Sequence, residues 1–479
     1  MRLTLERAVL AVTVLLAFAV AVSPAIDHDL WWHLRSGQWM VDNHAILRRD
    51  PFSHTRAGAI RLPSDWLGQL ALYATWSVGG LTAVALLTAG LATAGMALVL
   101  RVCQGPVVLR AAVVVLASAA STVFWTARPQ MFTFVLTAGV VLVLTTFGRN
   151  RGARAGRLWL LVPLFVLWSN LHLGWFYGLG VLWGTVAGEV ADRALHRAAL
   201  PKRAWRTLGA VAAVSSLAVM VNPVGPRIYG LLATQVGIGR RFIQENQPPR
   251  LGDPITLPFF LLLAVTAVVL ALRWRHVSLT GGLLVMGTAV AALTAARTIS
   301  LFATVTAPVL AHHASALLRA SIKTDRTKVL SLPQRPAVNA GLVVVVAALT
   351  VVTAAQRLSP PTVNAALRRE FPVAATDWIR ATRPPGLLYN TFDWGGYLIW
   401  ELPQYPVSID GRADLYADQL EVYDRTRRAQ GWEGEFARQK VRVALLDTNG
   451  PLALAVAADP NWEVAHRDRV ATVLVMRTP

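Results

Sequence analysis

The chain alternates long apolar runs with short polar segments. Most of these runs approach the roughly 20 residues with which an α-helix crosses the hydrocarbon core of a bilayer. The pattern predicts a polytopic α-helical membrane protein with about eleven transmembrane helices. The apolar runs lie at residues 8–26, 81–100, 108–126, 129–147, 158–170, 173–191, 207–222, 256–272, 278–295, 299–318 and 337–355.

Basic residues fall mainly in every second loop between these runs. The positive-inside rule therefore places these loops and the N-terminus in the cytoplasm. Residues 21–23 resemble a signal-peptidase site, but the length of the first run and the many runs after it favour a retained anchor. An odd number of spans then puts the C-terminal part on the extracytoplasmic side. The basic loops lie within residues 101–110, 149–157, 193–206, 273–275 and 319–335.

Composition supports a location in the cell membrane, in contact with lipids. Hydrophobic residues make up 54% of the 479 positions and charged residues 15%. The formal net charge of +20 would also suit a nucleic-acid-binding protein, but the charges are scattered over short loops and form no basic face, so we exclude that partner. Cys103 is the only cysteine, and the chain therefore has no internal disulfide.

Two domains are expected. Residues 1–355 form the transmembrane domain, with long outer loops at 27–80 and 222–256. Residues 356–479 form an extracytoplasmic domain in which short strands alternate with helices, a pattern typical of a small α/β layer. Strands are expected at 387–390, 407–410, 443–446, 462–466 and 471–476, and helices at 395–402 and 419–428.

The first outer loop opens with two carboxylates and two imidazoles set among tryptophans, in residues 27–33. Residues 30–41 have apolar side chains at helical spacing, which predicts an amphipathic helix in the membrane interface. Asp27 and Asp29 directly follow an apolar run and repel one another, a cost that suggests a catalytic role. His33 is four residues from Asp29, shares its face and is a substrate-binding candidate that could orient a carboxylate or bind sugar hydroxyls. A structural alternative is that Asp29 caps the helix and His33 pairs with it.

Further polar residues fall near the predicted outer surface, and we expect them to bind substrate. Arginines, an amide and an imidazole at one membrane depth could converge on a single ligand. The alternative is that the arginines snorkel to the surface and that the amide and imidazole satisfy backbone groups at a helical hairpin. The candidates are Arg128, Asn170, His172, Arg240, Arg241 and Arg297.

Residues 393–397 and 410–414 of the outer domain fall at the ends of predicted strands, where loops tend to bind ligands. Asp393, Asp410 and Arg412 are therefore weaker candidates for binding an acceptor. The alternative is that the glycines in these segments serve tight turns and that Asp410 pairs with Arg412. Neither segment resembles a nucleotide-binding loop, so a soluble nucleotide-sugar donor is not indicated.

The order of these parts resembles the GT-C superfamily of membrane glycosyltransferases. The likeness covers roughly residues 1–355: a first span, a large outer loop with an acidic motif, interfacial helices and many further spans. Residues 27–37, 50–53 and 65–67 are similar to the opening of bacterial members, although His28 separates the two acids where several members have adjacent acids. The resemblance implies a sugar donor linked to polyprenyl phosphate and an extracytoplasmic acceptor, which could be a glycan, lipid or protein.

The chemistry of such a donor suits these residues. Lipid phosphate is a good leaving group, so the protein needs mainly a base, Asp27 or Asp29, and cations for the departing phosphate. A single displacement would invert the anomeric centre. Binding of a divalent cation by Asp27, Asp29 and His172 is a further possibility. Two alternative functions are a lipid or glycan flippase and a non-catalytic assembly protein.

Overall fold

The computed structural model describes residues 3–195, 200–233, 244–321 and 335–477. The chain forms two compact units. We call the first the helical unit; it comprises Met1–Ser23, Ala85–Ile228 and Gln244–Arg357. The second, the mixed unit, comprises Pro24–Val84, Tyr229–Ile243 and Leu358–Pro479. The outer loop expected at 27–80 thus packs with the C-terminal residues into one unit.

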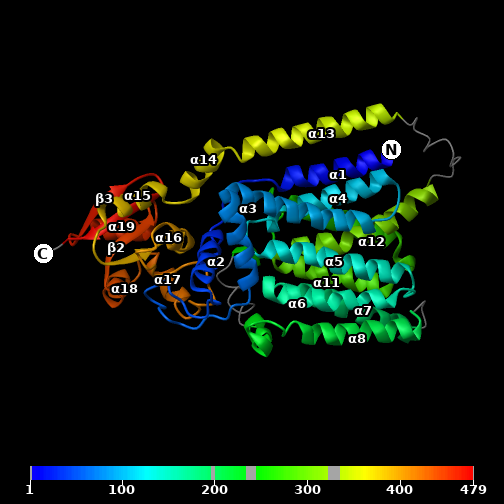
Figure 1. The fold of residues 1–479 in the computed structure, drawn as a ribbon, viewed down its shortest axis with the longest axis horizontal. Helices are drawn as coiled ribbons and strands as arrows, with labels where there is room; N and C mark the ends of the chain where they lie inside the picture. Colours follow the sequence, from blue (N-terminus) through cyan, green and yellow to red (C-terminus); the bar gives the residue numbers. More distant parts are fainter. Residues whose placement is uncertain (1–2, 196–199, 234–243, 322–334, 478–479) are drawn as a thin grey trace. The chain divides into compact units, whose positions relative to one another are not determined.

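Every apolar run identified in the sequence falls on a helix, which confirms the polytopic helical fold (Figure 1). Turns of 3-10 helix extend several of them. The helices of this set are α1 (Leu5–Ala21), α3 (Trp66–Val102), α4 (Val107–Ser121), α5 (Gln130–Arg149), α6 (Leu161–Leu171), α7 (Trp175–Ala194), α8 (Lys202–Ala218), α10 (Leu257–Leu272), α11 (Leu279–Thr294), α12 (Ile299–Ser321) and α13 (Pro336–Arg357). The 3-10 turns are η1 (Thr122–Phe124), η2 (Ala155–Leu160), η3 (Gly225–Arg227), η4 (Gln244–Asn246), η5 (Trp274–His276) and η6 (Ala296–Thr298).

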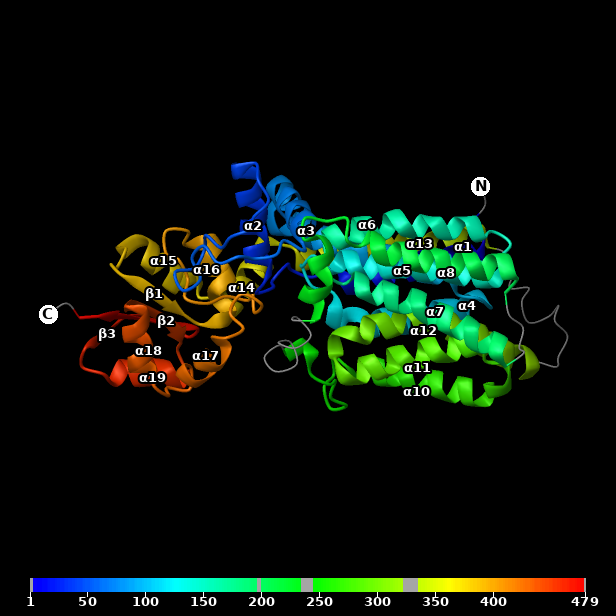
Figure 2. The same cartoon turned by 90° about the horizontal axis from the view of Figure 1, so that it is seen from below.

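Within the helical unit the long helices run side by side (Figure 2). Among the described residues, five helices are long and apolar enough to cross a membrane, and three more apolar helices are shorter. Helix α12 packs against α4, α10 and α11, and α13 packs against α1. Helices α7 and α11 approach closely at Gly188, where an added Cβ would lie 2.4 Å from Cα of Thr280.

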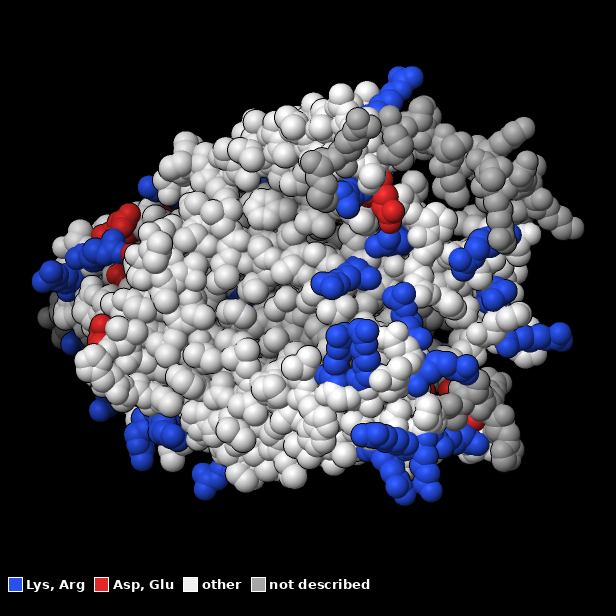
Figure 3. All heavy atoms as spheres, turned by 45° about the vertical axis from the view of Figure 1, so that its right-hand side comes forward, with Lys and Arg blue, Asp and Glu red and all other residues white. Residues whose placement is uncertain are grey.

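Lys and Arg side chains gather over one end of the helices of this unit (Figure 3). The turns between α3 and α4, between α5 and α6 and between α7 and α8 carry many of these residues, and Arg101, Arg151 and Arg203 are exposed there. This clustering agrees with the basic loops that the sequence marks as cytoplasmic.

Helix α3 is broken near its middle. Gly79 has φ −157° and ψ 26°, and Gly80 has φ 58° and ψ −149°. The conformation of Gly80 is open essentially only to glycine, because a Cβ would clash with the backbone. The Gly79-Gly80 pair therefore fixes the position of this break.

The mixed unit contains the small α/β layer expected from the sequence. Its sheet has the order β1-β2-β4-β3, with β1 and β2 parallel and the other pairs antiparallel. Buried aromatic side chains of Tyr389, Trp432, Phe436 and Trp462 pack on one face of this sheet. The strands are β1 (Leu387–Asn390), β2 (Val441–Asp447), β3 (Trp462–Arg467) and β4 (Ala471–Met476). The helices and one 3-10 turn are α2 (Leu30–Asn43), α14 (Pro360–Glu370), α15 (Val373–Thr382), η7 (Phe392–Trp394), α16 (Gly395–Glu401), α17 (Leu420–Thr426), α18 (Trp432–Gln439) and α19 (Pro451–Ala458).

The strand expected at 407–410 is wrong. Val407 makes only an isolated bridge to Ser53. The Asn390 side chain satisfies the neighbouring backbone instead: its oxygen accepts from the Ser408 N–H at 2.9 Å, and its nitrogen donates to the Ile409 carbonyl at 2.8 Å. A buried amide therefore replaces the hydrogen bonds of a strand ladder.

Candidate functional site

The two acids that follow α1 are held in defined positions within the mixed unit. Asp27 is buried, and its Oδ1 accepts a hydrogen bond from the Asp29 N–H at 2.8 Å. Asp29 Oδ1 accepts from the indole Nε1 of Trp32 at 3.0 Å. Asp29 stands at the N-cap of α2, but its side chain makes no capping bond. The Asp29 carboxylate is therefore oriented by Trp32, and helix capping does not explain its orientation.

Two glycines bring backbone against this pair. A Cβ added at Gly411 would lie 1.9 Å from Oδ1 of Asp29, and one added at Gly396 would lie 2.7 Å from the His28 carbonyl oxygen. Real Cβ atoms do not approach other atoms so closely, so neither position has room for a side chain. The backbone at Gly396 and Gly411 thus packs directly against His28 and Asp29.

His33 lies against the start of α3. Its Nδ1 lies 3.5 Å from Oδ2 of Asp65 and 3.4 Å from the side-chain nitrogen of Gln69. The Arg61 guanidinium is 3.8 Å from the same carboxylate. Burial raises the pKa of Asp65; Arg61 opposes this shift, and Asp414 adds to it. We call Asp27, Asp29, His33 and Asp65 the acidic cluster.

A second cluster lies in the helical unit, where the turns before α5, α7 and α12 converge. Arg128 forms an ion pair with Glu245 at 3.1 Å, and Arg297 donates to Oδ1 of Asn246 at 3.3 Å. Arg297 also interacts with the Tyr177 hydroxyl. We call Arg128, His172, Arg297 and Glu245 the arginine cluster. It brings together three of the residues that the sequence places near the outer surface.

His172 is neutral in this setting. Burial, followed by the positive charges of Arg297 and Arg128, lowers its pKa to about 3. Its Nδ1 accepts from the Gly174 N–H at 3.0 Å and lies 2.8 Å from Oγ1 of Thr133. An accepting Nδ1 leaves the proton on Nε2. His172 can therefore donate one hydrogen bond without adding charge.

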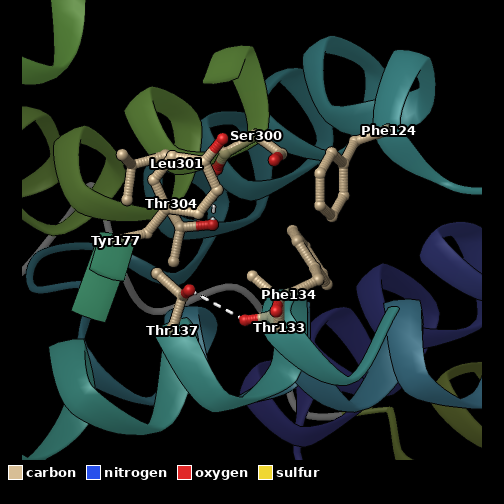
Figure 4. A pocket seen from close by; sticks show the side chains of 8 residues that line it. All are labelled: Phe124, Thr133, Phe134, Thr137, Tyr177, Ser300, Leu301 and Thr304. Atoms are coloured by element: carbon tan, nitrogen blue, oxygen red, sulfur yellow. Dashed lines mark hydrogen bonds between the residues drawn. The ribbon is translucent and has the colours of Figure 1, made fainter. Parts of the chain in front are cut away.

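A small cavity borders the arginine cluster (Figure 4). Thr133, which contacts His172, and Tyr177, which contacts Arg297, both line it. Ser300 and Thr304 of α12 face them across the cavity. A volume of about 10 Å³ is room for about one water molecule.

The remaining candidates take other places. The Asn170 side chain donates to the carbonyls of Val166 and Val221, both at 2.8 Å, as the hairpin alternative predicts. Asp393 is exposed in η7, directly after β1. Arg240 and Arg241 lie outside the described residues. Three or more His, Cys, Asp or Glu side chains placed to hold a metal ion do not occur in the described part of the chain, and the divalent cation stays a prediction.

Asp410 and Arg412 form a buried ion pair. Nε and one terminal nitrogen of Arg412 donate to the two oxygens of Asp410 at 2.7 and 2.6 Å. The other terminal nitrogen donates to Asp50 at 2.6 Å, and the Tyr416 hydroxyl donates to Asp410 at 2.8 Å. All three charged side chains are 0% exposed. Asp410 thus pairs with Arg412, as the alternative interpretation of the sequence predicts. Our proposal therefore does not assign acceptor binding to these two side chains.

Two residues of the clusters, Asp65 and Glu245, and the neighbouring Tyr177 were not singled out from the sequence as site residues. Asp65 and Glu245 lie in polar segments that flank apolar runs, so their position was a usable signal. Tyr177 lies inside an apolar helix, where one aromatic hydroxyl resembles an ordinary core or interface residue. Only the fold brings it to Arg297.

Comparison with known proteins identifies the fold. No protein-family model and no curated protein matches the sequence. The structure resembles the archaeal oligosaccharyltransferase AglB from Archaeoglobus fulgidus, in complex with an inhibitory peptide and a dolichol-phosphate, with a TM-score of 0.57 and 12% identity over 92% of this chain and 69% of AglB. ArnT from Cupriavidus metallidurans, bound to undecaprenyl phosphate, aligns over 97% of both chains at 13% identity and a TM-score of 0.49. The likeness to AglB is one of fold, and it confirms the expected polytopic helical architecture with a small α/β part.

Proposed function

We propose that this chain is a membrane glycosyltransferase that moves a sugar from a polyprenyl-phosphate carrier to an extracytoplasmic acceptor. One observation carries the proposal: in a fold like that of AglB, the carboxylate of Asp29 follows the first apolar helix and is oriented by the Trp32 indole at 3.0 Å. A carboxylate whose direction is fixed in this way suits a general base. The dolichol-phosphate bound to AglB supports a polyprenyl phosphate as the carrier.

Asp29 is the better candidate for the base. The Oδ1 of Asp27 is already engaged by the Asp29 N–H, and Asp27 is only 7% exposed. Asp29 is less buried and would remove the proton from the acceptor hydroxyl as that oxygen attacks the anomeric carbon. General-base assistance of this kind contributes about a hundred- to ten-thousand-fold in rate. The bond from the anomeric carbon to the phosphate oxygen breaks in the same step, so the anomeric centre inverts.

The arginine cluster would receive the phosphate. Arg128 and Arg297 offer forked donors that match phosphate oxygens. The neutral His172 would add a hydrogen bond from Nε2, and Glu245 would keep Arg128 in place until the carrier arrives. Leaving-group charge is thus stabilised by two cations, without a proton donor.

Two variants separate this function from transport or assembly. Purified full-length protein is given undecaprenyl phosphate, whose binding is followed by native mass spectrometry. It is also given a panel of radiolabelled undecaprenyl-phosphate sugars together with a cell-envelope extract as the source of acceptor hydroxyls, and sugar release from the carrier to that extract is counted. We expect Asp29→Asn to bind the lipid normally and to lose at least a hundredfold in sugar release. Arg297→Gln should weaken lipid binding. Sugar release unchanged by Asp29→Asn would refute the assignment of the base, and wild-type protein that neither binds the lipid nor releases sugar would refute the function.

A further inference from the structure

A cavity of about 110 Å³ lies within the mixed unit, and its lining includes none of the four residues of the acidic cluster. One wall comes from α2, and the other comes from residues 399–406, at the end of α16 and beyond it. Its lining includes Arg35, Trp39, Phe52, Pro403, Tyr405 and Pro406. The lining residues other than Arg35 are aromatic, proline or aliphatic, both polar and apolar atoms border the space, and Arg35 is the single charged side chain.

That charge lacks a counterion. Arg35 donates from one terminal nitrogen to Oε1 of Gln38 at 2.7 Å. Its Nε is buried and has no hydrogen-bond partner. Among the described residues no carboxylate lies within ion-pair distance of Arg35, whereas Arg412, in the same unit, has two. A guanidinium has five donors, and leaving them unused in a partly buried place is costly. The cavity is therefore complementary to an anion that can take a forked pair of hydrogen bonds.

The walls indicate what the anion is attached to. Trp39, Phe52 and Tyr405 present aromatic rings, and Pro403 and Pro406 present saturated rings. Flat apolar surfaces of this kind pack well against the C–H face of a pyranose ring, whose hydroxyls point outward. A single guanidinium matches the single charge and the two coplanar oxygens of a carboxylate. A sugar that carries a carboxylate satisfies both the guanidinium and the walls.

We propose that this cavity binds a uronic acid unit, a sugar bearing a carboxylate, of the acceptor glycan. The assignment to the acceptor rests on the proposed transferase function, whereas binding of the sugar itself does not. Arg35 would hold the carboxylate end-on through its two terminal nitrogens, and Trp39 would stack on the sugar ring. The site would thus select acidic glycans over neutral ones.

Binding of methyl glucuronide and methyl glucoside to the purified full-length protein tests this. Saturation-transfer NMR gives both affinities, and we expect the glucuronide to bind at least tenfold more tightly. Arg35→Gln should lose this preference, Arg35→Lys should keep part of it, and Trp39→Leu should weaken both sugars. Arg442→Gln, which removes an exposed charge from β2 of the same unit, is the matched control and should bind like the wild type.

Three results would overturn the proposal. One is equal binding of the two sugars by the wild-type protein, and another is a glucuronide affinity unchanged in Arg35→Gln. The third is loss of short-chain phosphatidylglycerol binding in Arg35→Gln without any effect on glucuronide, which would make the cavity a lipid headgroup site. Glucuronide binding that depends on Arg35 but is accompanied by no sugar release from any carrier would keep the binding site and reject the transferase.

Discussion

At the scale of single residues, the position of the Asp29 carboxylate depends on the absence of a side chain at Gly411. We expect Gly411→Ala to displace the Asp29 carboxylate, because the new methyl group would lie 1.9 Å from its Oδ1. Sugar release should fall at least tenfold while undecaprenyl phosphate still binds. Gly434→Ala is the control, since a Cβ there meets no atom within 4 Å. Equal activity of the two variants would show that Asp29 does not depend on this contact.

Among the described residues, Arg412 is the only cation that pairs with Asp50 and Asp410. Arg412→Met should destabilise the mixed unit by about 3–5 kcal/mol, because Asp50 and Asp410 would remain buried and unpaired. The melting temperature of the purified protein measures this loss. Arg427→Gln breaks an exposed pair with Asp424 and should cost only about 0–1 kcal/mol. Similar melting temperatures of the two variants would contradict a structural role for the buried pair.

The same network predicts a dependence on acid. Burial alone would raise the pKa of Asp410, but the charge and hydrogen bonds of Arg412 and the Tyr416 hydroxyl outweigh it and hold that pKa below its usual value. A carboxyl whose pKa is lowered by folding stabilises the folded state at pH values above its unfolded pKa of about 3.9. This stabilisation is lost as the pH falls through the pKa of the folded state. The melting temperature should therefore drop as the pH falls below about 4. Asp410→Asn should show a shallower drop, and an unchanged slope would argue against this assignment.

At the scale of elements, the break in α3 offers a direct test. Gly80→Ala should destabilise the protein by about 1–3 kcal/mol, because φ 58° and ψ −149° are unfavourable for any residue with a Cβ. Gly90→Ala lies in the same helix, meets nothing within 4 Å and should be neutral or slightly stabilising. Thermal unfolding of the two variants distinguishes them. A tolerated Gly80→Ala would mean that the break is not imposed by glycine.

Helices were predictable from the sequence and one strand was not, for a physical reason. A run of some 20 apolar residues has few alternatives to a membrane helix, since every backbone group must be bonded within the segment. Segment 407–410 has the composition of a strand, but whether it joins a sheet depends on what satisfies its backbone. The side chain of Asn390, seventeen residues before Val407, forms hydrogen bonds with the backbone of this segment. No local sequence pattern predicts such bonds.

At the scale of the whole molecule, the candidate site was partly predictable. Asp29, Arg128, His172 and Arg297 were found because polar residues at the ends of apolar runs are costly and therefore informative. Several of their partners were not, because tertiary packing brings them together. His33 lies 3.5 Å from Asp65, and the close approach of Asp29 and Gly411 joins positions 382 residues apart in the chain.

The orientation of the chain in the membrane remains a prediction, and it decides whether Asp29 can meet an extracytoplasmic acceptor. In a Cys103→Ser background, single cysteines at exposed Asp42 and Arg151 report on the two sides. A membrane-impermeant maleimide added to intact cells should label Asp42→Cys and should reach Arg151→Cys only after the cells are permeabilised, because basic loops stay inside. The reverse pattern would place the acidic cluster in the cytoplasm and would remove the basis for a polyprenyl-linked donor presented on the outer face.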